Sequence, residues 1–346
     1  MGLNIREIVS RKEVDVSKFK GKILCVDAFN TLYQFLSTIR QMDGTPLMDS
    51  KERITSHLSG IFYRNIALMS EGIKLIYVFD GKAPALKAKT YKKRKEARDI
   101  AQERYEEAKQ EEDYSTMRRY SSQLLRLNDE MIAESKELLE SMGIMVVQAP
   151  SEGEAESAYL CKENDKIYAS VSQDYDSLLF GAPLLVRNLT ISRKKKTPTG
   201  YIEILPEMIS LDEVLKELEI NLDQLICLGI IVGTDYNPKG IPRIGQKKAL
   251  KIVQEHKTPE AIFDSLKEKI DELEEEDKFD WKEIFELFKN HDVNNVEINF
   301  PKVNYDKVKK ILVEEHEFSE DRVERQLDKL RDLEKAGKQK SLDKWF

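Results

Sequence analysis

Five short runs of aliphatic and β-branched residues constrain the fold of this chain more than any other feature. They occupy 22–27, 73–80, 144–150, 167–174 and 184–189. Stretches of helical periodicity separate them, which predicts an α/β fold with a mainly parallel central sheet flanked by helices. Four runs end in, or shortly before, Asp27, Asp80, Glu152 and Asp174. Because ligands bind beyond the carboxyl ends of parallel strands, we expect these acids to converge.

The overall composition indicates a soluble chain that can form a real core. It has 346 residues, 40% of them hydrophobic, and a net charge of -7. No apolar run reaches the roughly 18 residues that a membrane span needs, and no hydrophobic signal segment is present. Cys25, Cys161 and Cys227 are widely spaced among apolar residues, as is typical of reduced core thiols. We expect a cytoplasmic protein that does not contact membranes.

Changes in composition divide the chain into five parts. The expected parts are a first part at 1–84, an inserted helical arm at 85–142, an internal part at 143–255, a C-terminal helical region at 256–336 and a tail at 337–346. The arm is almost entirely charged or helix-forming, and it is too long for a simple crossover helix. The net charge of the chain is negative, but charged residues of each sign are clustered along the sequence. Local charged patches, rather than the net charge, therefore decide which partner the chain binds.

The acidic residues have structural explanations when each is taken alone. An Asp at a strand end is more often a helix cap or turn residue than a ligand. Ser151 and Glu154 suit a capping box, which accounts for one of Glu152 and Glu154 but not for both. Asp174 and Asp176 lie two residues apart, and extended geometry would direct both side chains the same way. Like charges placed so closely repel unless a cation lies between them.

The types of residue in this cluster indicate which cation and which chemistry to expect. Its ligands are oxygens only, which favours Mg²⁺ or Mn²⁺. None of the histidines falls within the acidic motifs, so a zinc hydrolase is disfavoured. Paired sites of oxygen ligands most often catalyse phosphoryl transfer with two metal ions. We therefore infer phosphodiester hydrolysis.

Several motifs resemble those of the flap endonucleases, within the wider family of structure-specific 5′ nucleases. They are VDAFNTLYQFL (26–36), VFDGKAP (78–84), APSEGEAE (149–156), SQDYDSLLFG (172–181) and GTDYNPKGIPRIGQKKAL (233–250). They follow the family's order over about the first 255 residues. The resemblance adds Asp235 as a seventh acid. It implies that one metal ion is served mainly by Asp27, Asp80, Glu152 and Glu154, and the other by Asp174, Asp176 and Asp235, with Glu154 near both.

Three alternatives to a flap endonuclease remain. VDAFNTL imitates the first motif of haloacid-dehalogenase-type phosphatases, but Phe29 stands where that family has its acid catalyst. Another nuclease of the same 5′ family, such as a junction-resolving or repair incision enzyme, is the second alternative. The third is a non-catalytic adaptor that binds DNA and the sliding clamp, which the complete set of acids disfavours.

The arm begins with a basic helical segment. Lys87, Tyr91, Arg94 and Arg98 have helical spacing and would share one face. The alternative is a solvated helix whose charges pair with one another. By the resemblance, Lys87 and Arg94 match the catalytic lysine and arginine of the arch through which a single-stranded flap passes. Tyr33, which in isolation would be a core residue, matches the aromatic residue that stacks on a base.

The stretch KGIPRIGQKKALKIV (239–253) resembles a helix-hairpin-helix turn, expected within about 222–255. There Gly240 and Gly245 would let backbone N–H groups meet a DNA phosphate, and Lys247, Lys248 and Lys251 would add charge. In the family, this turn usually holds a monovalent ion, K⁺. At Arg243 the sequence departs from the family pattern, which usually has Gly at the start of the second turn. A left-handed backbone at this position is strained by a side chain.

The last residues resemble a sliding-clamp docking motif. Its matching positions are Gln339, Leu342, Trp345 and Phe346. Ending directly after the aromatic pair, the chain is expected to be archaeal. The resemblance implies a 5′-flap endonuclease with 5′-3′ exonuclease activity, two Mg²⁺ ions that Mn²⁺ can replace, and DNA with a 5′ single-stranded flap as substrate. It further implies work in Okazaki-fragment maturation and repair, near the nucleoid, as a monomer apart from the clamp.

Overall fold

The computed structural model describes most of the chain. It covers 3–41, 44–111, 113–121, 123–124, 126–191, 194–197 and 200–342. Within these ranges, 88–89, 91–94, 114, 118, 194–197 and 336–342 are described by their backbone alone. Among the described residues, no helix combines the length and the apolar character that crossing a membrane requires.

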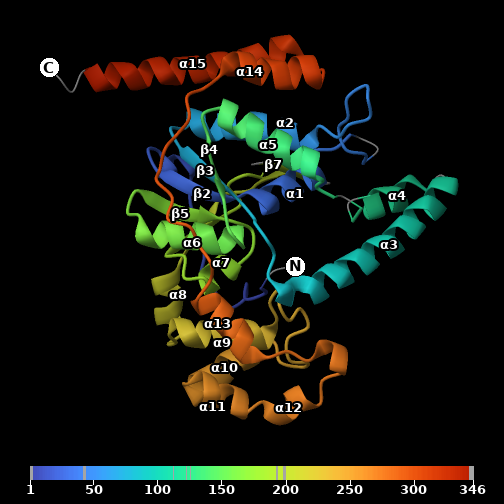
Figure 1. Cartoon of the computed structure of the whole chain (residues 1–346), viewed down its shortest axis with the longest axis vertical. Helices are drawn as coiled ribbons and strands as arrows, with labels where there is room; N and C mark the ends of the chain where they lie inside the picture. Colours follow the sequence, from blue (N-terminus) through green and yellow to red (C-terminus); the bar gives the residue numbers. More distant parts are fainter. Residues whose placement is uncertain are drawn as a thin grey trace.

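A seven-stranded sheet forms the centre of the protein (Figure 1). Its strands are, in sheet order, β1 (Lys12–Glu13), β9 (Glu207–Ser210), β6 (Leu184–Arg187), β5 (Ile167–Val171), β2 (Ile23–Asp27), β3 (Lys74–Phe79) and β4 (Met145–Gln148). The strands from β6 to β4 are parallel, whereas β9 pairs antiparallel with β6 and β1. Each of the five predicted runs contains one of the parallel strands, so the predicted mainly parallel sheet is confirmed.

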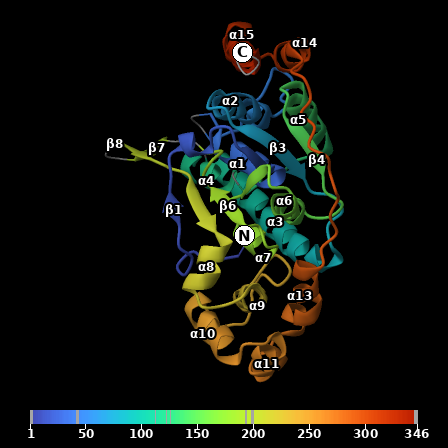
Figure 2. The same ribbon diagram turned by 90° about the vertical axis from the view of Figure 1, so that its left-hand side faces the viewer.

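The antiparallel strands were not predicted. They include β1, β9 and a separate hairpin of β7 (Lys194–Thr197) and β8 (Gly200–Glu203), which projects from the body in Figure 2. These strands are two to four residues long, and β7 has the sequence KKKT. Segments so short and so polar carry too little alternation of hydrophobic and polar residues to be recognised as strands.

The order of the strands places the acidic residues together. From β2 the chain moves to β3 and β4 on one side, then returns to β5 and β6 on the other side of β2. This reversal leaves a crevice at the carboxyl ends of β2, β3 and β5, as in other open parallel sheets. Asp27 ends β2, Asp80 follows β3, and Asp174 lies just beyond β5.

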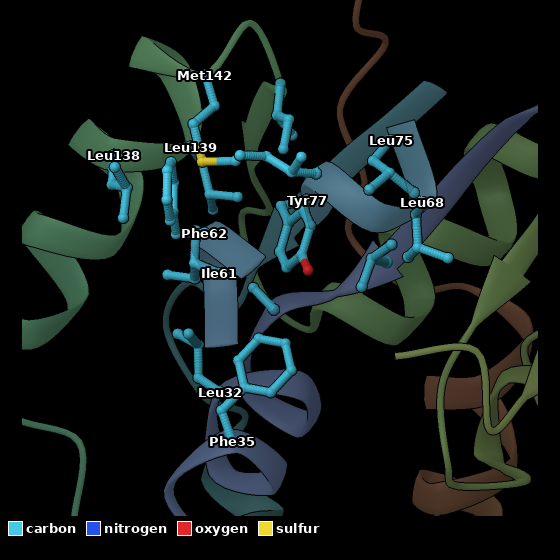
Figure 3. Close-up of a cluster of buried hydrophobic side chains, with 14 of the residues drawn as sticks. Leu32, Phe35, Ile61, Phe62, Leu68, Leu75, Tyr77, Leu138, Leu139 and Met142 are labelled. Atoms are coloured by element: carbon cyan, nitrogen blue, oxygen red, sulfur yellow. The ribbon is translucent and has the colours of Figure 1, made fainter. Parts of the chain in front are cut away.

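Helices cover both faces of the sheet. One face packs against α1 (Ala28–Thr38), α2 (Ser56–Ser70) and α5 (Asp129–Ser141). Figure 3 shows part of this core, with Tyr77 of β3 between residues of α2 and α5. The Tyr77 hydroxyl donates to Asn65 Oδ1 at 2.8 Å, which satisfies a polar group that burial would otherwise penalise. On α2, Gly60 permits close packing, because a Cβ there would lie 2.2 Å from Phe35 Cγ.

The opposite face packs against a second group of helices. It contacts α6 (Gly153–Glu163) and α7 (Asp176–Leu179), and α9 (Leu222–Val232) packs beneath α7. Around them lie α8 (Leu211–Glu217), α10 (Gln246–His256), α11 (Pro259–Asp264), α12 (Lys267–Asp271), η3 (Glu275–Asp277) and α13 (Trp281–Lys289). The short helix η1 (Val16–Phe19) instead buries Val16 and Phe19 in the core of the first face. The protein is therefore a layered α/β structure.

The projecting arm is shorter than the sequence predicted. It consists of η2 (Ala85–Lys87), α3 (Ala88–Gln110) and α4 (Tyr114–Ser121), and Figure 1 shows α3 and α4 extending away from the sheet. The predicted range of 85–142 also included α5, which belongs to the core because Met131, Leu138 and Leu139 are buried. The many charges on α5 had masked this apolar stripe. The arm is thus confined to 85–121.

The C-terminal region, predicted as one helical unit at 256–336, is split in two. Helices α11 and α13 pack on α9, and residues 291–304, which contain neither helix nor strand, run along the side of the sheet (Figure 1). Then α14 (Tyr305–Lys309), the π-helical η4 (Lys310–Glu315) and α15 (Glu320–Leu342) pack against α2 and α5. Helix α15 continues past the predicted start of the tail at 337.

Candidate active site

All seven predicted carboxylates line one cavity at the carboxyl ends of the strands. The lining comprises Asp27, Asp80, Glu152, Glu154, Asp174, Asp176 and Asp235 together with Phe29, Asn30, Tyr33, Gly81 and Lys87. We call this space the acidic cavity. The predicted convergence of the acids is confirmed, and Lys87 and Tyr33 lie beside them.

The first two acids are held by backbone amides. Asp27 is the N-cap of α1, and its Oδ1 accepts from the Asn30 amide at 3.0 Å. Asp80 Oδ1 accepts from the Gly153 amide at 2.6 Å, which joins the end of β3 to the start of α6. A Cβ on Gly153 would lie 2.8 Å from that oxygen. Asp27 therefore caps a helix and also lines the acidic cavity, so the two explanations of this residue are compatible.

Ser151 and Glu154 do not form the capping box that the sequence allowed. Glu152 itself is the N-cap of α6, but its side chain makes no capping hydrogen bond. Glu154 Oε1 instead accepts from the Ser172 hydroxyl at 2.7 Å, across the acidic cavity from α6 to the segment after β5. Helix capping therefore explains neither glutamate, which leaves a role within the acidic cavity for both.

Asp174 and Asp176 lie close together for a different reason than the one predicted. An extended strand was expected to direct both side chains the same way, but β5 ends at Val171 and α7 begins at Asp176. Asp174 Oδ2 accepts from the Asn30 side-chain amide at 3.0 Å, and Asp176 Oδ1 accepts from the Leu3 amide at 3.0 Å. A turn between strand and helix, rather than a strand, brings both acids to the acidic cavity.

Asp235 and Lys87 close the acidic cavity from the side of the arm. Asp235 follows α9, and its backbone carbonyl accepts from the Thr90 hydroxyl of α3. Lys87 lies just before α3, with its Nζ 2.8 Å from Glu152 Oε1 and 3.7 Å from Asp235 Oδ2. The base of the arm is therefore tied to the acidic cavity both by a hydrogen bond and by ion pairs.

The acidic cavity has more negative charge than its buried surroundings tolerate. Burial raises the pKa of Asp27 to about 8, and the charge of Asp80 adds to this effect. Burial and the Asp174 charge raise the pKa of Asp176 to about 7, and burial and Asp176 hold the pKa of Glu154 well above its usual value. For Lys87, burial opposes the charged form, but Glu152 and Asp235 raise its pKa. Added cations would relieve this excess.

Hard divalent cations fit this set of ligands. The donors are carboxylate oxygens, with neither a histidine nor a cysteine in the lining. Across the described residues, however, no group of three or more His, Cys, Asp or Glu side chains forms a compact metal-binding cluster. The acids surround an open cavity instead. This arrangement still suits Mg²⁺, which usually keeps several waters and takes only one or two carboxylates as direct ligands.

Several residues of the site escaped the sequence analysis. They are Asn30, Gly81, Thr90, Ser172 and Tyr236. Asn30 carried the clearest signal, because a polar residue in the first turn after Asp27 is positioned to bond the same acids. Tyr236 directly follows Asp235, and its ring lies 5.5 Å from Lys87 Nζ. An aromatic residue beside an acid has no distinctive pattern, so only the structure identifies it.

The basic face of the arm is described only in part. The backbone of Tyr91 and Arg94 belongs to α3, but their side chains lie outside the described part of the structure. Arg98 is half-buried on the same helix. Tyr33 is 39% exposed at the mouth of the acidic cavity, so it is not the core residue that it would have been in isolation.

Two packed helices occupy the predicted helix-hairpin-helix. They are α9 and α10, joined by a loop in which the Ile241 amide donates to the Ile231 carbonyl at 2.8 Å. Gly240 has φ 56°, and a Cβ there would lie 2.5 Å from the Ile231 oxygen, so only glycine fits. Arg243 has φ 65°, which is the left-handed backbone expected at this departure from the pattern.

The basic residues of this element lie on its surface. Gly245 is the N-cap of α10, and Lys247, Lys248 and Lys251 on this helix are exposed. Lys247 Nζ lies 3.3 Å from Glu7 Oε2, which is an exposed pair worth little. The predicted phosphate contacts and the K⁺ ion stay predictions.

The predicted clamp-binding residues are scarcely described. The backbone of Gln339 and Leu342 is helical within α15, while their side chains lie outside the described part. Trp345 and Phe346 lie wholly outside the described residues.

Comparisons with known proteins agree on one family. The family model of the XPG N-terminal domain matches residues 3–101, and that of the XPG I-region matches 143–235. Flap endonuclease 1 of Pyrococcus furiosus is 50% identical, with 100% of this chain and 99% of the relative covered. The enzyme of the same name from Sulfolobus acidocaldarius is 45% identical, with 99% and 100% covered.

Solved structures show the same fold. Flap endonuclease-1 from Methanococcus jannaschii has a TM-score of 0.75 and 39% identity, with 96% of this chain and 98% of that chain covered. The catalytic core of Rad2, solved in complex with a DNA substrate, has a TM-score of 0.69 at 21% identity, with 95% and 100% covered. The second likeness concerns the fold alone.

Proposed function

Because the chain belongs to the flap endonuclease 1 family, we propose that it is a structure-specific nuclease that hydrolyses DNA at 5′ single-stranded flaps. The observation that carries the proposal is the acidic cavity, where seven carboxylates and Lys87 face one space. During phosphodiester hydrolysis the scissile phosphate, itself negatively charged, would have to approach these carboxylates. Cations on both sides of the phosphate are required to offset the repulsion. The phosphatase alternative fails, since Phe29 lines the acidic cavity where a general acid would be needed.

The seven carboxylates would hold two Mg²⁺ ions, which Mn²⁺ can replace. When bound, such a pair of ions activates a water molecule and stabilises the leaving oxygen of an in-line displacement. The raised pKa values of Asp27 and Asp176 support the proposal, because cations would keep these buried acids ionised at neutral pH. Asn30 and Ser172 orient Asp174 and Glu154 through hydrogen bonds, as the outer partners of metal ligands commonly do.

The base of the arm would meet the reacting phosphate. Lys87 already lies in the acidic cavity, and Arg94 follows it two helical turns later. Two cations on one side would neutralise the phosphate and screen it from the carboxylates. Tyr33, partly exposed at the mouth of the acidic cavity, would stack on the neighbouring base, and stacking does not depend on sequence.

Duplex DNA would be anchored by the loop between α9 and α10. The exposed Lys247, Lys248 and Lys251 would contact its phosphates, with K⁺ held at the turn. Contacts of this kind read the backbone and the shape of DNA rather than its bases. The chain is accordingly expected to recognise junctions with a free 5′ strand, whatever their sequence, and to have 5′-3′ exonuclease activity as well.

We further propose that the nuclease serves Okazaki-fragment maturation and DNA repair, docked on the sliding clamp. The docking residues would be Gln339, Leu342, Trp345 and Phe346, at the end of the chain beyond the packed part of α15. An aromatic pair after a polar segment suits an apolar pocket on a partner. Apart from the clamp, the protein would act as a monomer.

A substrate comparison tests the nuclease proposal. Cleavage of 5′-flap, 3′-flap, four-way-junction and plain duplex DNA is measured with Mg²⁺ and with EDTA. We expect the 5′ flap to be cut fastest, with no cleavage in EDTA. Preference for the four-way junction would favour the junction-resolving alternative, and cleavage in EDTA would refute the metal site.

A single substitution separates chemistry from binding. Asp174→Ala should abolish cleavage, because it removes one ligand and the acceptor of the Asn30 amide. DNA affinity, measured by fluorescence anisotropy in Ca²⁺, should persist, since the anchoring residues are elsewhere. Asp223→Ala is the control, as this exposed acid pairs with Lys289 on the surface. Unchanged cleavage by Asp174→Ala would refute the assignment.

A further inference from the structure

Lys87 is the one predicted phosphate-binding cation whose side chain is described within the acidic cavity, and it is already paired there. Its Nζ lies 2.8 Å from Glu152 Oε1 and 3.7 Å from Asp235 Oδ2. The side chains of these three residues are only 17%, 10% and 16% exposed, respectively. Solvent therefore screens the pairs weakly, and their energy exceeds that of an ordinary surface pair.

An aromatic ring supports the ammonium in this position. Lys87 Nζ lies 5.5 Å from the centroid of the Tyr236 ring, within the range of a cation–π interaction. Tyr236 is 4% exposed, and its ring packs edge-on against Phe288 with 5.3 Å between centroids. A ring fixed in this way cannot follow the lysine if it moves. The ammonium therefore has a defined seat between Tyr236 and the two acids.

We propose that Lys87 is a resident cation of the acidic cavity, seated on Tyr236, and that it competes with divalent metal for Glu152 and Asp235. This inference rests on the proposed metal site and deepens it. Glu152 and Asp235 come from different parts of the chain, the start of α6 and the loop after α9. Without a cation between them, the two carboxylates would repel. The ammonium holds them together until a divalent ion takes its place.

The competition would couple metal binding to substrate binding. While Lys87 neutralises Glu152 and Asp235, its charge is not available to a phosphate. A divalent ion at these acids releases the ammonium, which lies at the base of the arm and is then free to meet the scissile phosphate. The ring of Tyr236 acts through Lys87, so Tyr236 is a positioning residue, and its hydroxyl also lies beside Glu152. The arrangement favours productive contact with DNA only after the metal has bound.

Metal titration without DNA tests the competition directly. Binding of Mn²⁺ to the full chain is measured by isothermal titration calorimetry for the unaltered protein, Lys87→Met and Lys82→Met. Lys82 is exposed on the same segment, so its substitution matches the change in net charge. We expect Lys87→Met to bind Mn²⁺ about tenfold more tightly and Lys82→Met to change affinity less than twofold. Equal or weaker binding by Lys87→Met would overturn the inference.

Thermal unfolding gives a second readout that does not depend on activity. In EDTA, Lys87→Met should melt at a lower temperature than the unaltered protein, because it loses the ammonium that pairs with both acids. Saturating Mg²⁺ should raise its melting temperature by more than it raises that of the unaltered protein. An equal rise in both proteins would contradict the competition. If the unaltered protein binds no Mn²⁺ at all, the proposed metal site fails, and this inference fails with it.

Substitutions of Tyr236 test the seat of the ammonium. Tyr236→Phe keeps the ring and removes only the hydroxyl beside Glu152, so it is the reference against which loss of the ring is measured. Tyr236→Leu removes the ring face and should tighten Mn²⁺ binding about threefold, because the lysine is held less firmly. In the Lys87→Met background, the same substitution should have no further effect. An effect of equal size in both backgrounds would show that Tyr236 acts on the acids rather than on Lys87.

Discussion

Asn30 donates its side-chain amide to Asp174 Oδ2 at 3.0 Å, and so joins the first turn of α1 to the segment after β5. The backbone amide of the same residue donates to Asp27 Oδ1 at 3.0 Å. Its Oδ1 accepts from the Gln173 amide at 3.3 Å. One residue therefore fixes the relative positions of two acids that come from neighbouring strands.

Asn30→Ala should slow flap cleavage about tenfold, because a hydrogen bond to a charged group contributes on the order of 1.5–3 kcal/mol. The substitution leaves Asp174 free to turn away from the other acids. Single-turnover cleavage at saturating Mg²⁺ measures the effect. Gln34→Ala removes an amide from the same helix at a position that bonds Thr190 rather than an acid. Equal losses in both variants would mean that Asn30 acts only through the stability of α1.

Arg243→Gly should stabilise the protein by about 1 kcal/mol. Arg243 has φ 65°, and a left-handed backbone costs a non-glycine residue roughly 1–2 kcal/mol. Part of this gain is lost, since glycine has more freedom in the unfolded chain. Urea unfolding measures the difference. Arg243→Ala is the matched control, because it removes the same charge but keeps the Cβ, and a similar gain in that variant would point to charge instead of strain.

Gly240→Ala should have the opposite effect and destabilise the protein by more than about 2 kcal/mol. A methyl group at this position would lie 2.5 Å from the backbone oxygens of Ile231 and Val232, in addition to the unfavourable φ of 56°. The loop between α9 and α10 would have to open. Gly245→Ala provides the comparison, since a Cβ there meets nothing within 4 Å. A loss of stability of this size should accompany only the first change.

His316 links the C-terminal helices to the core through buried charges. The Nε2 atom of His316 lies 3.0 Å from Glu134 Oε1, and its Nδ1 atom lies 3.2 Å from Asp49 Oδ2. Each acid has a second partner, because Arg53 pairs with Asp49 and His57 approaches Glu134. Burial alone would lower the pKa of His316, but the hydrogen bond with Glu134 raises it above 6.5. Burial opposes ionisation of Glu134 too, yet its histidine partners lower the pKa to about 2.

The free energy of unfolding should therefore depend on pH through His316. A raised pKa means that its contribution is fully present below pH 6.5 and is lost as the pH rises through the folded-state value. The contribution of Glu134 is present above pH 4.5 and is lost as the pH falls toward 2. His316→Gln should cost about 1–3 kcal/mol at pH 6 and less at pH 9.

Urea unfolding at the two pH values measures this difference. The control is His256→Gln, at the end of α10 and away from the network around His316. A cost for His316→Gln that stays constant between pH 6 and pH 9 would argue that packing, and not charge, makes His316 stabilising.

Hydrophobic patterning was enough to predict the parallel strands and the convergence of their acids. Runs such as 22–27 and 73–80 are short, continuous and apolar, and helical segments separate them, as is typical of buried parallel strands. Helix α5 was assigned to the arm because charged residues surround its apolar stripe. The split of the C-terminal region could not be predicted either, since residues 291–304 have no period that reveals where the chain goes next.

The sequence by itself determined the composition of the site, because carboxylates at the ends of apolar strands must gather at one edge of a parallel sheet. Only the tertiary structure decided how they are held. A turn between β5 and α7 holds Asp174 and Asp176 where an extended strand was expected. The bridge from Asn30 and the seat of Lys87 on Tyr236 join segments far apart in the chain. Such contacts depend on side-chain packing across strands and helices, and no local periodicity encodes them.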